Sequence, residues 1–258
     1  MNTTLTTNSI VAELTNRGYN AEATQTVKNG VTLEGVCIRS GNIGAIIYIQ
    51  NLITCASVEE ATEKAIEIYE SHKDPEIDTT QMSSPDFILN HVYIGLQRSS
   101  EQELYKIDCP FEDVEAYLYV RINDDMTYKM TPDMISAFSL DAKEVEERAR
   151  ANTFSISKIN SLAEMLGICE LDNPIGVISN ENRSLGASAI LDTEALKGYC
   201  KARNISKLII IPSSIHECLL IDANTISTEE ASAMVTDVNA TQVDPCEQLA
   251  DHVFTFEC

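Results

Sequence analysis

The chain has 258 residues, and 44% of them are hydrophobic, which is enough to bury a core and argues against global disorder. It carries 18 lysines and arginines against 40 aspartates and glutamates, a formal net charge of −22. This balance argues against proteins that need clustered basic residues, so we expect no direct contact with nucleic acid and no docking on an anionic membrane.

The sequence shows no targeting signal and no membrane span. Residues 1–8 are polar, and no apolar run approaches the ~20 residues that cross a bilayer. We therefore expect a cytoplasmic protein. The cysteines have no CxxC spacing, and Cys37, Cys200 and Cys218 fall at apolar positions. We expect free thiols rather than a disulfide framework.

Residues 1–75 predict a helix, three strands and a second helix. The expected elements are a helix capped by Asn8, strands over 24–28, 31–39 and 43–49 joined by turns at Asn29-Gly30 and 40–42, and a helix opened by Ser57 and Glu60. Residues 73–84 are typical of a linker.

The remainder predicts further helices and strands. The expected middle elements are a helix over 85–95 capped by Ser84, strands over 116–122 and 126–130 with a turn at 123–125, and a helix over 142–151 capped by Asp141. The expected later elements are a helix over 161–166, strands over 175–179, 187–191, 208–211, 217–221 and 253–256, helices opened by Asp192 and Ser227, and a helical turn at Asp244-Pro245.

This order lacks the regular βαβ alternation of a doubly wound sheet, so we predict an α+β fold with mixed or antiparallel sheets and packed helices. We expect two lobes, 1–155 and 156–258. The order of elements in the first lobe is similar to the secretion-chaperone-like fold, a likeness that does not fix function.

Known signatures of chemistry are absent from the sequence. The histidines have no partner at i+3 or i+4, and there is no zinc spacing, no phosphate-binding glycine motif and no GxSxG elbow. We expect no metal ion, no nucleotide and no other cofactor.

One segment, 210–217, places polar side chains after an apolar strand and a proline. On an extended backbone Ser214 and His216 share one face, and Glu217 points to the other. One interpretation is a hydrolase with Ser213 or Ser214 as nucleophile and His216 as base. The other is a turn whose hydroxyls bond the local backbone, with a histidine that holds a loop. The spacing favours the turn, because residues i and i+2 on a strand rarely reach the hydrogen-bond distance of about 3 Å that the pair needs. A polar binding site lies between the two interpretations.

Other polar residues could converge on that site. Asn180 and Arg183 lie in a turn before Gly186, which we expect to supply a positive φ or close packing. Asn239 ends a helix, and Asp251 precedes the last strand as the candidate carboxylate of a hydrolase. Arg183 has the fork that binds a carboxylate. A turn or a helix cap would also explain each of these residues.

Several strings of the sequence match a family pattern: 177–180, 186–191, 211–217, 247–251, 27–31 and 148–153. On these strings the chain resembles, over nearly its whole length, the bacterial family called domain of unknown function 5688. The most specific string is Pro-Ser-Ser-Ile-His-Glu at 212–217. The resemblance implies no reaction. It implies that 213–217 is the best candidate for a shared feature, and that the chain is an accessory protein associated with mobile elements.

Three functions remain open. The first is a non-enzymatic acidic protein that binds a protein partner. The second is a hydrolase that uses Ser213 or Ser214 with His216 and Asp251. The third is an acidic mimic of nucleic acid. The residues we expect in a binding site are Asn180, Arg183, Ser213, Ser214, His216, Glu217 and Asn239.

Overall fold

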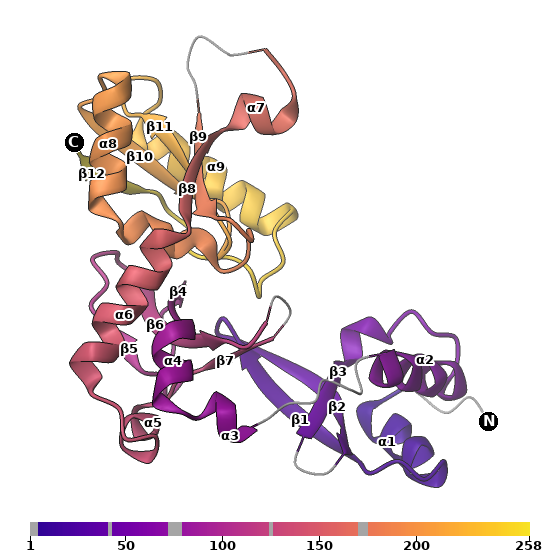
Figure 1. The fold of residues 1–258 in the computed structure, drawn as a ribbon. Coiled ribbons are helices and arrows are strands. Elements are labelled where there is room, and N and C mark those ends of the chain that lie inside the picture. The colour runs from indigo at the N-terminus through magenta and orange to yellow at the C-terminus, as the bar shows by residue number, and fades with distance from the viewer. Residues whose placement is uncertain (1–4, 41–42, 72–78, 124–125, 170–174) are drawn as a thin grey trace. The chain divides into compact units, whose positions relative to one another are not determined.

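The computed structural model describes residues 5–40, 43–71, 79–123, 126–169 and 175–258 (Figure 1). They belong to two compact units, one within residues 1–78 and one of residues 79–258. Every strand pairing in these ranges is antiparallel. The predicted α+β class is therefore confirmed. The turns expected at 40–42 and 123–125 and much of the linker expected at 73–84 fall outside the described residues.

The first unit is a three-stranded meander with two α-helices. Its elements are α1 (Thr7–Asn16), β1 (Ala21–Lys28), β2 (Val31–Ser40), β3 (Ile43–Tyr48), the 3-10 helix η1 (Ile49–Asn51) and α2 (Val58–Ser71). The strands pair in the order β1-β2-β3. The core consists of apolar side chains from the sheet and both helices: Ile10, Leu14, Val36, Ile38, Ile47, Leu52, Ala61, Ala65 and Tyr69.

Local signals fixed most of this unit. Asn29 and Gly30 turn the β1–β2 hairpin with φ of 49° and 77°, the left-handed backbone that a type I′ turn needs. The N-cap prediction for the first helix was wrong, because Thr6 rather than Asn8 caps α1. Thr6 accepts the Ser9 N–H, and the Ser9 hydroxyl accepts the Thr6 N–H in return.

The second unit begins with helices and a four-stranded sheet. Its first elements are α3 (Thr79–Met82), α4 (Pro85–His91), β4 (Val92–Arg98), β5 (Lys106–Ile107), β6 (Val114–Arg121), β7 (Thr127–Lys129), α5 (Pro132–Ala137) and α6 (Ala142–Ser155). β6 is central, with β4 on one edge and both β5 and β7 on the other. Helices α4 and α6 lie beside one face of this sheet (Figure 1).

A five-stranded sheet follows. Its elements are β8 (Ser157–Ser161), α7 (Leu162–Leu166), β9 (Gly176–Asn180), the 3-10 helix η2 (Gly186–Leu191), α8 (Thr193–Arg203), β10 (Lys207–Pro212), β11 (Cys218–Asp222), α9 (Thr228–Thr241) and β12 (Phe254–Glu257). The strand order is β12-β10-β11-β9-β8, so β12 and β8 are the edge strands. Helix α9 packs Ala231 and Val235 on Ile209 and Val253.

One hydrophobic core joins the two sheets of the second unit. It runs from Ile88 and Leu118 through Ile178 and Leu208 to Phe254. The lobe boundary that we expected near residue 155 therefore lies inside this unit, at the last residue of α6. Element order alone does not reveal that side chains before and after this point share a core.

Residues 187–191 and 92–95 take a different secondary structure from the predicted one. Residues 187–191, expected as a strand, lie in η2, and Ala187 to Ile190 are all buried. A short apolar run does not distinguish a buried strand from a buried helix. The helix expected over 85–95 ends at His91, and the β-branched residues Val92 and Ile94 belong to β4.

The cysteines are also partly different from expectation. Cys200 and Cys258 form a disulfide, with Cα atoms 5.9 Å apart, so the prediction of a free thiol was wrong for this pair. The bond ties α8 to the end of the chain beyond β12. The pair is 58 residues apart in sequence, so no spacing motif revealed it. The other six cysteines form no disulfide with a described residue. Across the described ranges, no helix combines the length and the apolar character that crossing a membrane requires.

Candidate functional site

The segment 213–217 forms the loop between β10 and β11. The Ser214 N–H donates to the Glu217 carbonyl at 3.2 Å, and Ser214 Oγ accepts the His216 N–H at 3.0 Å. The Ser214 hydroxyl thus bonds the local backbone, as a turn residue does. Among the described residues, neither Ser213 nor Ser214 has a side-chain hydrogen bond to an imidazole. The loop therefore offers no assembled nucleophile–base pair.

The His216 side chain joins two other loops. Its Nδ1 accepts the Leu185 N–H at 3.0 Å, so the neutral ring carries its proton on Nε2. Nε2 lies 3.6 Å from Glu247 Oε1, and the His216 carbonyl accepts the Ser179 hydroxyl at 2.7 Å. His216 consequently holds the turn after β9 and the loop before β12 against the β10–β11 loop.

The turn after β9 is built by the side chain of Asn180. Its Nδ2 donates to the Ser184 carbonyl at 2.7 Å, and its Oδ1 accepts the Ser184 N–H at 3.2 Å. Arg183 takes a φ of 51°, and its side chain is exposed. A Cβ at Gly186 would clash with Ser179 Oγ and lie 2.6 Å from the Asn180 backbone nitrogen, so close packing, one of the two reasons expected for this glycine, is confirmed.

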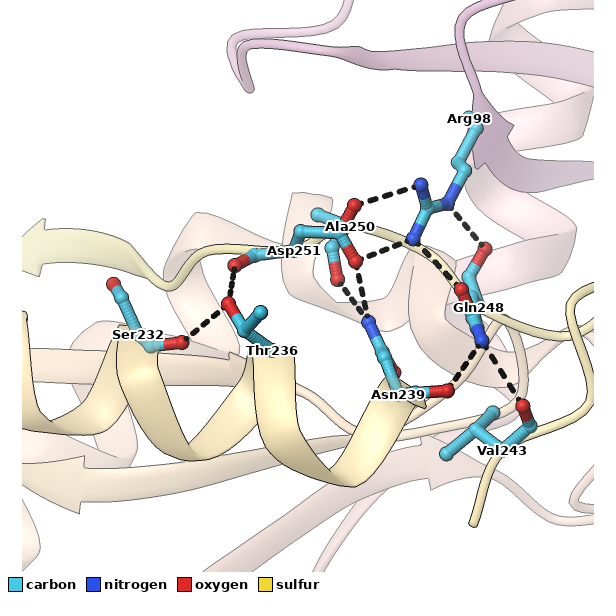
Figure 2. Close-up of polar contacts among 8 residues, drawn as sticks. All are labelled: Arg98, Ser232, Thr236, Asn239, Val243, Gln248, Ala250 and Asp251. Carbon is cyan, nitrogen blue, oxygen red and sulfur yellow. Dashed lines mark hydrogen bonds and ion pairs between the residues drawn. The ribbon is translucent and has the colours of Figure 1, made fainter. Parts of the chain in front are cut away.

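A second polar cluster surrounds Asp251, which pairs with Arg98 rather than with His216 (Figure 2). Arg98 ends β4, and its Nη1 and Nη2 donate to the two carboxylate oxygens of Asp251 at 2.9 and 2.7 Å. Asn239 Nδ2 donates to Asp251 Oδ1 at 2.9 Å and to the Ala250 carbonyl at 2.8 Å. Two of the predicted site residues, Asn239 and Asp251, therefore contact each other, but in a polar cluster that connects β4, α9 and a loop.

Gln248 is the fourth member of this polar cluster, with Arg98, Asn239 and Asp251. Its Oε1 accepts from Arg98 Nη2 at 3.0 Å, and its Nε2 donates to the carbonyls of Asn239 and Val243 at 2.8 and 3.0 Å (Figure 2). Hydrogen bonds from Arg98 and Asn239 hold the pKa of Asp251 below its usual value, against the effect of burial. A carboxylate that stays ionised and bonded is suited to anchoring a loop rather than to transferring a proton.

The anchored loop, residues 243–253, connects the polar clusters to the last strand. Its Glu247 carbonyl accepts the Ile215 N–H at 2.8 Å, which places the Glu247 side chain beside His216. The helical turn expected at Asp244 is a hydrogen-bonded turn that does not continue as a helix. His252 lies at the end of this loop, just before β12 begins at Phe254.

A cavity of about 600 Å³ lies beside β12, within the size range of ligand sites. Its walls come from the β5–β6 loop, α6, the η2–α8 junction and residues 252–256. The rings of Phe111 and Phe254 lie 4.5 Å apart, and the His252 ring meets Phe254 edge-on at 5.4 Å. Arg150 of α6 is half-buried in this wall and has no hydrogen bond or ion pair with any residue that the structure describes.

No described strand pairs with the outer edge of β12. The Cys258 N–H donates to the Ser206 carbonyl at 3.0 Å, which makes these two residues a hydrogen-bonded pair. Such pairs recur at every second residue of an antiparallel ladder, so Phe256 and Phe254 bond to β10. Thr255, between them, directs its N–H and C=O to the outer edge.

Sequence reasoning missed Arg98, Glu247 and most residues of the cavity wall. Arg98 bonds to a residue 153 positions away, and Phe111 reaches Phe254 from the β5–β6 loop. No spacing motif links such positions in one sequence. Within the described residues, no group of histidines, cysteines and carboxylates is placed to hold a metal ion.

Comparison with known proteins gives one match. A family model described as "Family of unknown function (DUF5688)" matches residues 5–257. No curated protein and no solved structure matches the chain. The likeness of the N-terminal elements to the secretion-chaperone-like fold stays a prediction.

Proposed function

The chain belongs to the DUF5688 family of unknown function, and from its geometry we propose that it is a non-enzymatic protein that binds an extended segment of a partner protein along β12. The observation that supports this proposal is the free outer edge of an edge strand next to a cavity with aromatic walls. A cytoplasmic location and an association with mobile elements stay predictions.

Addition of a strand to a sheet edge is a common way to bind a peptide. Main-chain hydrogen bonds provide affinity, and pockets for alternate side chains provide specificity. β12 offers the backbone groups of Thr255, and the cavity lies along Phe254, Thr255 and Phe256. β12 has only four residues, so its backbone alone can form few bonds with a partner. The cavity would therefore have to provide much of the affinity.

The hydrolase alternative has less support. The Ser214 hydroxyl bonds its own turn, and His216 Nδ1 is occupied by a backbone N–H. The proposed carboxylate, Asp251, is bound by Arg98. The three groups thus serve three separate structural contacts. The charge-mimic alternative stays a prediction from the net charge.

The test compares two substitutions at Thr255. Random ten-residue peptides displayed with free carboxyl termini are selected on the full chain, and the affinity of enriched peptides is measured by fluorescence anisotropy. Thr255→Pro removes the outward N–H, a change that edge strands tolerate, and we expect binding to weaken about 10-fold, the equivalent of one hydrogen bond at the upper end of its range. Thr255→Val keeps the N–H and should bind like the wild type.

Two results would contradict the proposal. One is a selection that enriches no peptide. The other is equal affinity of the wild type and a folded Thr255→Pro chain, with folding judged by circular dichroism.

A further inference from the structure

We infer that the segment bound at β12 carries a carboxylate beside an apolar side chain, with the carboxylate on Arg150 and the apolar group against Phe111 and Phe254. This inference rests on the proposed function and names the chemistry that the partner must present.

The first observation is that Arg150 has no acidic partner among the described residues. The chain has 40 acidic residues and 18 lysines and arginines, yet no carboxylate oxygen of the described residues lies within 4.0 Å of this guanidinium. Arg148, on the same helix, is exposed and does not line the cavity, so water solvates it. Arg150 is half-buried in the cavity wall, where a cation is less well hydrated and attracts an anion more strongly.

The second step is the kind of anion. A guanidinium presents paired N–H donors that match the two oxygens of a carboxylate. His252 lines the same cavity and has no hydrogen bond to a described residue, so its ring can donate a further bond. Asp108 and Glu112 also line the cavity, and their charges oppose a dianion such as a phosphate. The site therefore favours a singly charged carboxylate.

The third step is the apolar part of the ligand. The rings of Phe111 and Phe254 contact each other in the wall, and Phe256, Ile190 and Leu191 extend the apolar surface. A peptide strand that pairs with Thr255 places alternate side chains on this face of the sheet. Its residue next to the carboxylate would bury an aliphatic or aromatic side chain there. The carboxylate is either the chain terminus of the partner or an Asp or Glu side chain.

The test uses a matched pair of arginines on one helix. The same peptide library is selected on the wild type, Arg150→Gln and Arg148→Gln. We expect the wild type and Arg148→Gln to enrich peptides with a carboxylate beside an apolar residue. For the most enriched peptide, Arg150→Gln should weaken binding about 10-fold to 100-fold, the range of a charged hydrogen bond, and Arg148→Gln less than about twofold.

The source of the carboxylate is resolved with synthetic forms of that peptide. If the carboxyl terminus is recognised, its amidation weakens binding. If an acidic side chain is recognised, a Glu→Gln or Asp→Asn change in the peptide weakens binding instead. Equal affinity of all forms, or equal losses in Arg150→Gln and Arg148→Gln, would overturn the inference. If Thr255→Pro still weakens the binding of those peptides, the proposed function stands although the carboxylate inference fails. If no peptide is enriched, the proposed function and the inference both fail. Should Arg150→Gln not fold, Arg150→Lys, which keeps the charge but loses the fork, provides the comparison.

Discussion

At the scale of single residues, the polar contacts show which side chains hold the second unit together. Arg98 and Asp251 keep 31% and 54% of their side-chain surface exposed, and an isolated pair with such exposure contributes little to stability. Here the pair is bidentate. Asn239 and Gln248 form hydrogen bonds both with the pair and with backbone carbonyls of the loop. Its main effect is therefore to fix the loop that leads to β12.

The contribution of Asp251 should depend on pH. Its pKa is lower in the folded chain than in the unfolded chain, where it is about 3.9, so ionisation stabilises the fold above that value. This stabilisation is lost as the pH falls through the folded pKa. Asp251→Asn should lower the free energy of unfolding by about 0.5–1 kcal/mol at pH 7. In urea titrations the difference from wild type should shrink as the pH falls below about 3.9. Asp237→Asn, an exposed change on α9, is the control, and a difference independent of pH would contradict the assignment.

His216 should behave as a structural residue. His216→Ala leaves the Leu185 N–H without its acceptor, and we expect the free energy of unfolding to fall by about 1–2 kcal/mol. Ser213 has no side-chain hydrogen bond among the described residues, so Ser213→Ala should change it by less than about 0.5 kcal/mol. Esterase assays with activated esters serve as the second readout. Turnover that both substitutions abolish would revive the hydrolase alternative.

At the scale of elements, η2 packs closely against β9 at Gly186. Gly186→Ala would place a Cβ 2.6 Å from the Asn180 backbone nitrogen, which cannot rotate away. We expect a loss of about 1–3 kcal/mol, measured by urea denaturation. Gly198→Ala in α8 meets open space and should stabilise the chain by up to about 1 kcal/mol. Equal effects of the two substitutions would refute this explanation of Gly186.

The elements also show what one sequence can predict. Several short-range signals were sufficient: Asn29-Gly30 turns a hairpin, Ser84 caps α4, and Ser227 with Glu230 opens α9 with a capping box. The sequence has no such signal at the start of β4, so the predicted helix was extended into this strand. In the candidate site, the turn at Asn180 and the backbone role of Ser214 follow from local chemistry. The Arg98–Asp251 pair and the Cys200–Cys258 bond depend on chain topology, which local periodicity does not encode.

At the scale of the whole molecule, the core of the second unit defines what can fold alone. A fragment of residues 79–258 contains all of that core, whereas a fragment of residues 156–258 lacks Ile88, Leu118 and their neighbours. We expect the longer fragment to unfold cooperatively in urea and to give dispersed amide NMR signals. The shorter fragment should give neither. A folded 156–258 fragment would show that the boundary expected from the sequence is the energetic one.

The separation between Arg98 and Asp251 has a consequence for biosynthesis. A ribosome that adds about 5–20 residues per second needs roughly 8–30 s to extend the chain by the 153 positions from Arg98 to Asp251. During that time β4 is complete, but η2, which packs against it, and β12 are still to be made. Until η2 is made, the apolar side chains of β4 that pack against it stay uncovered. Slowing elongation after residue 100 would lengthen this exposure, so the demand for nascent-chain chaperones should rise with slower codons in this stretch.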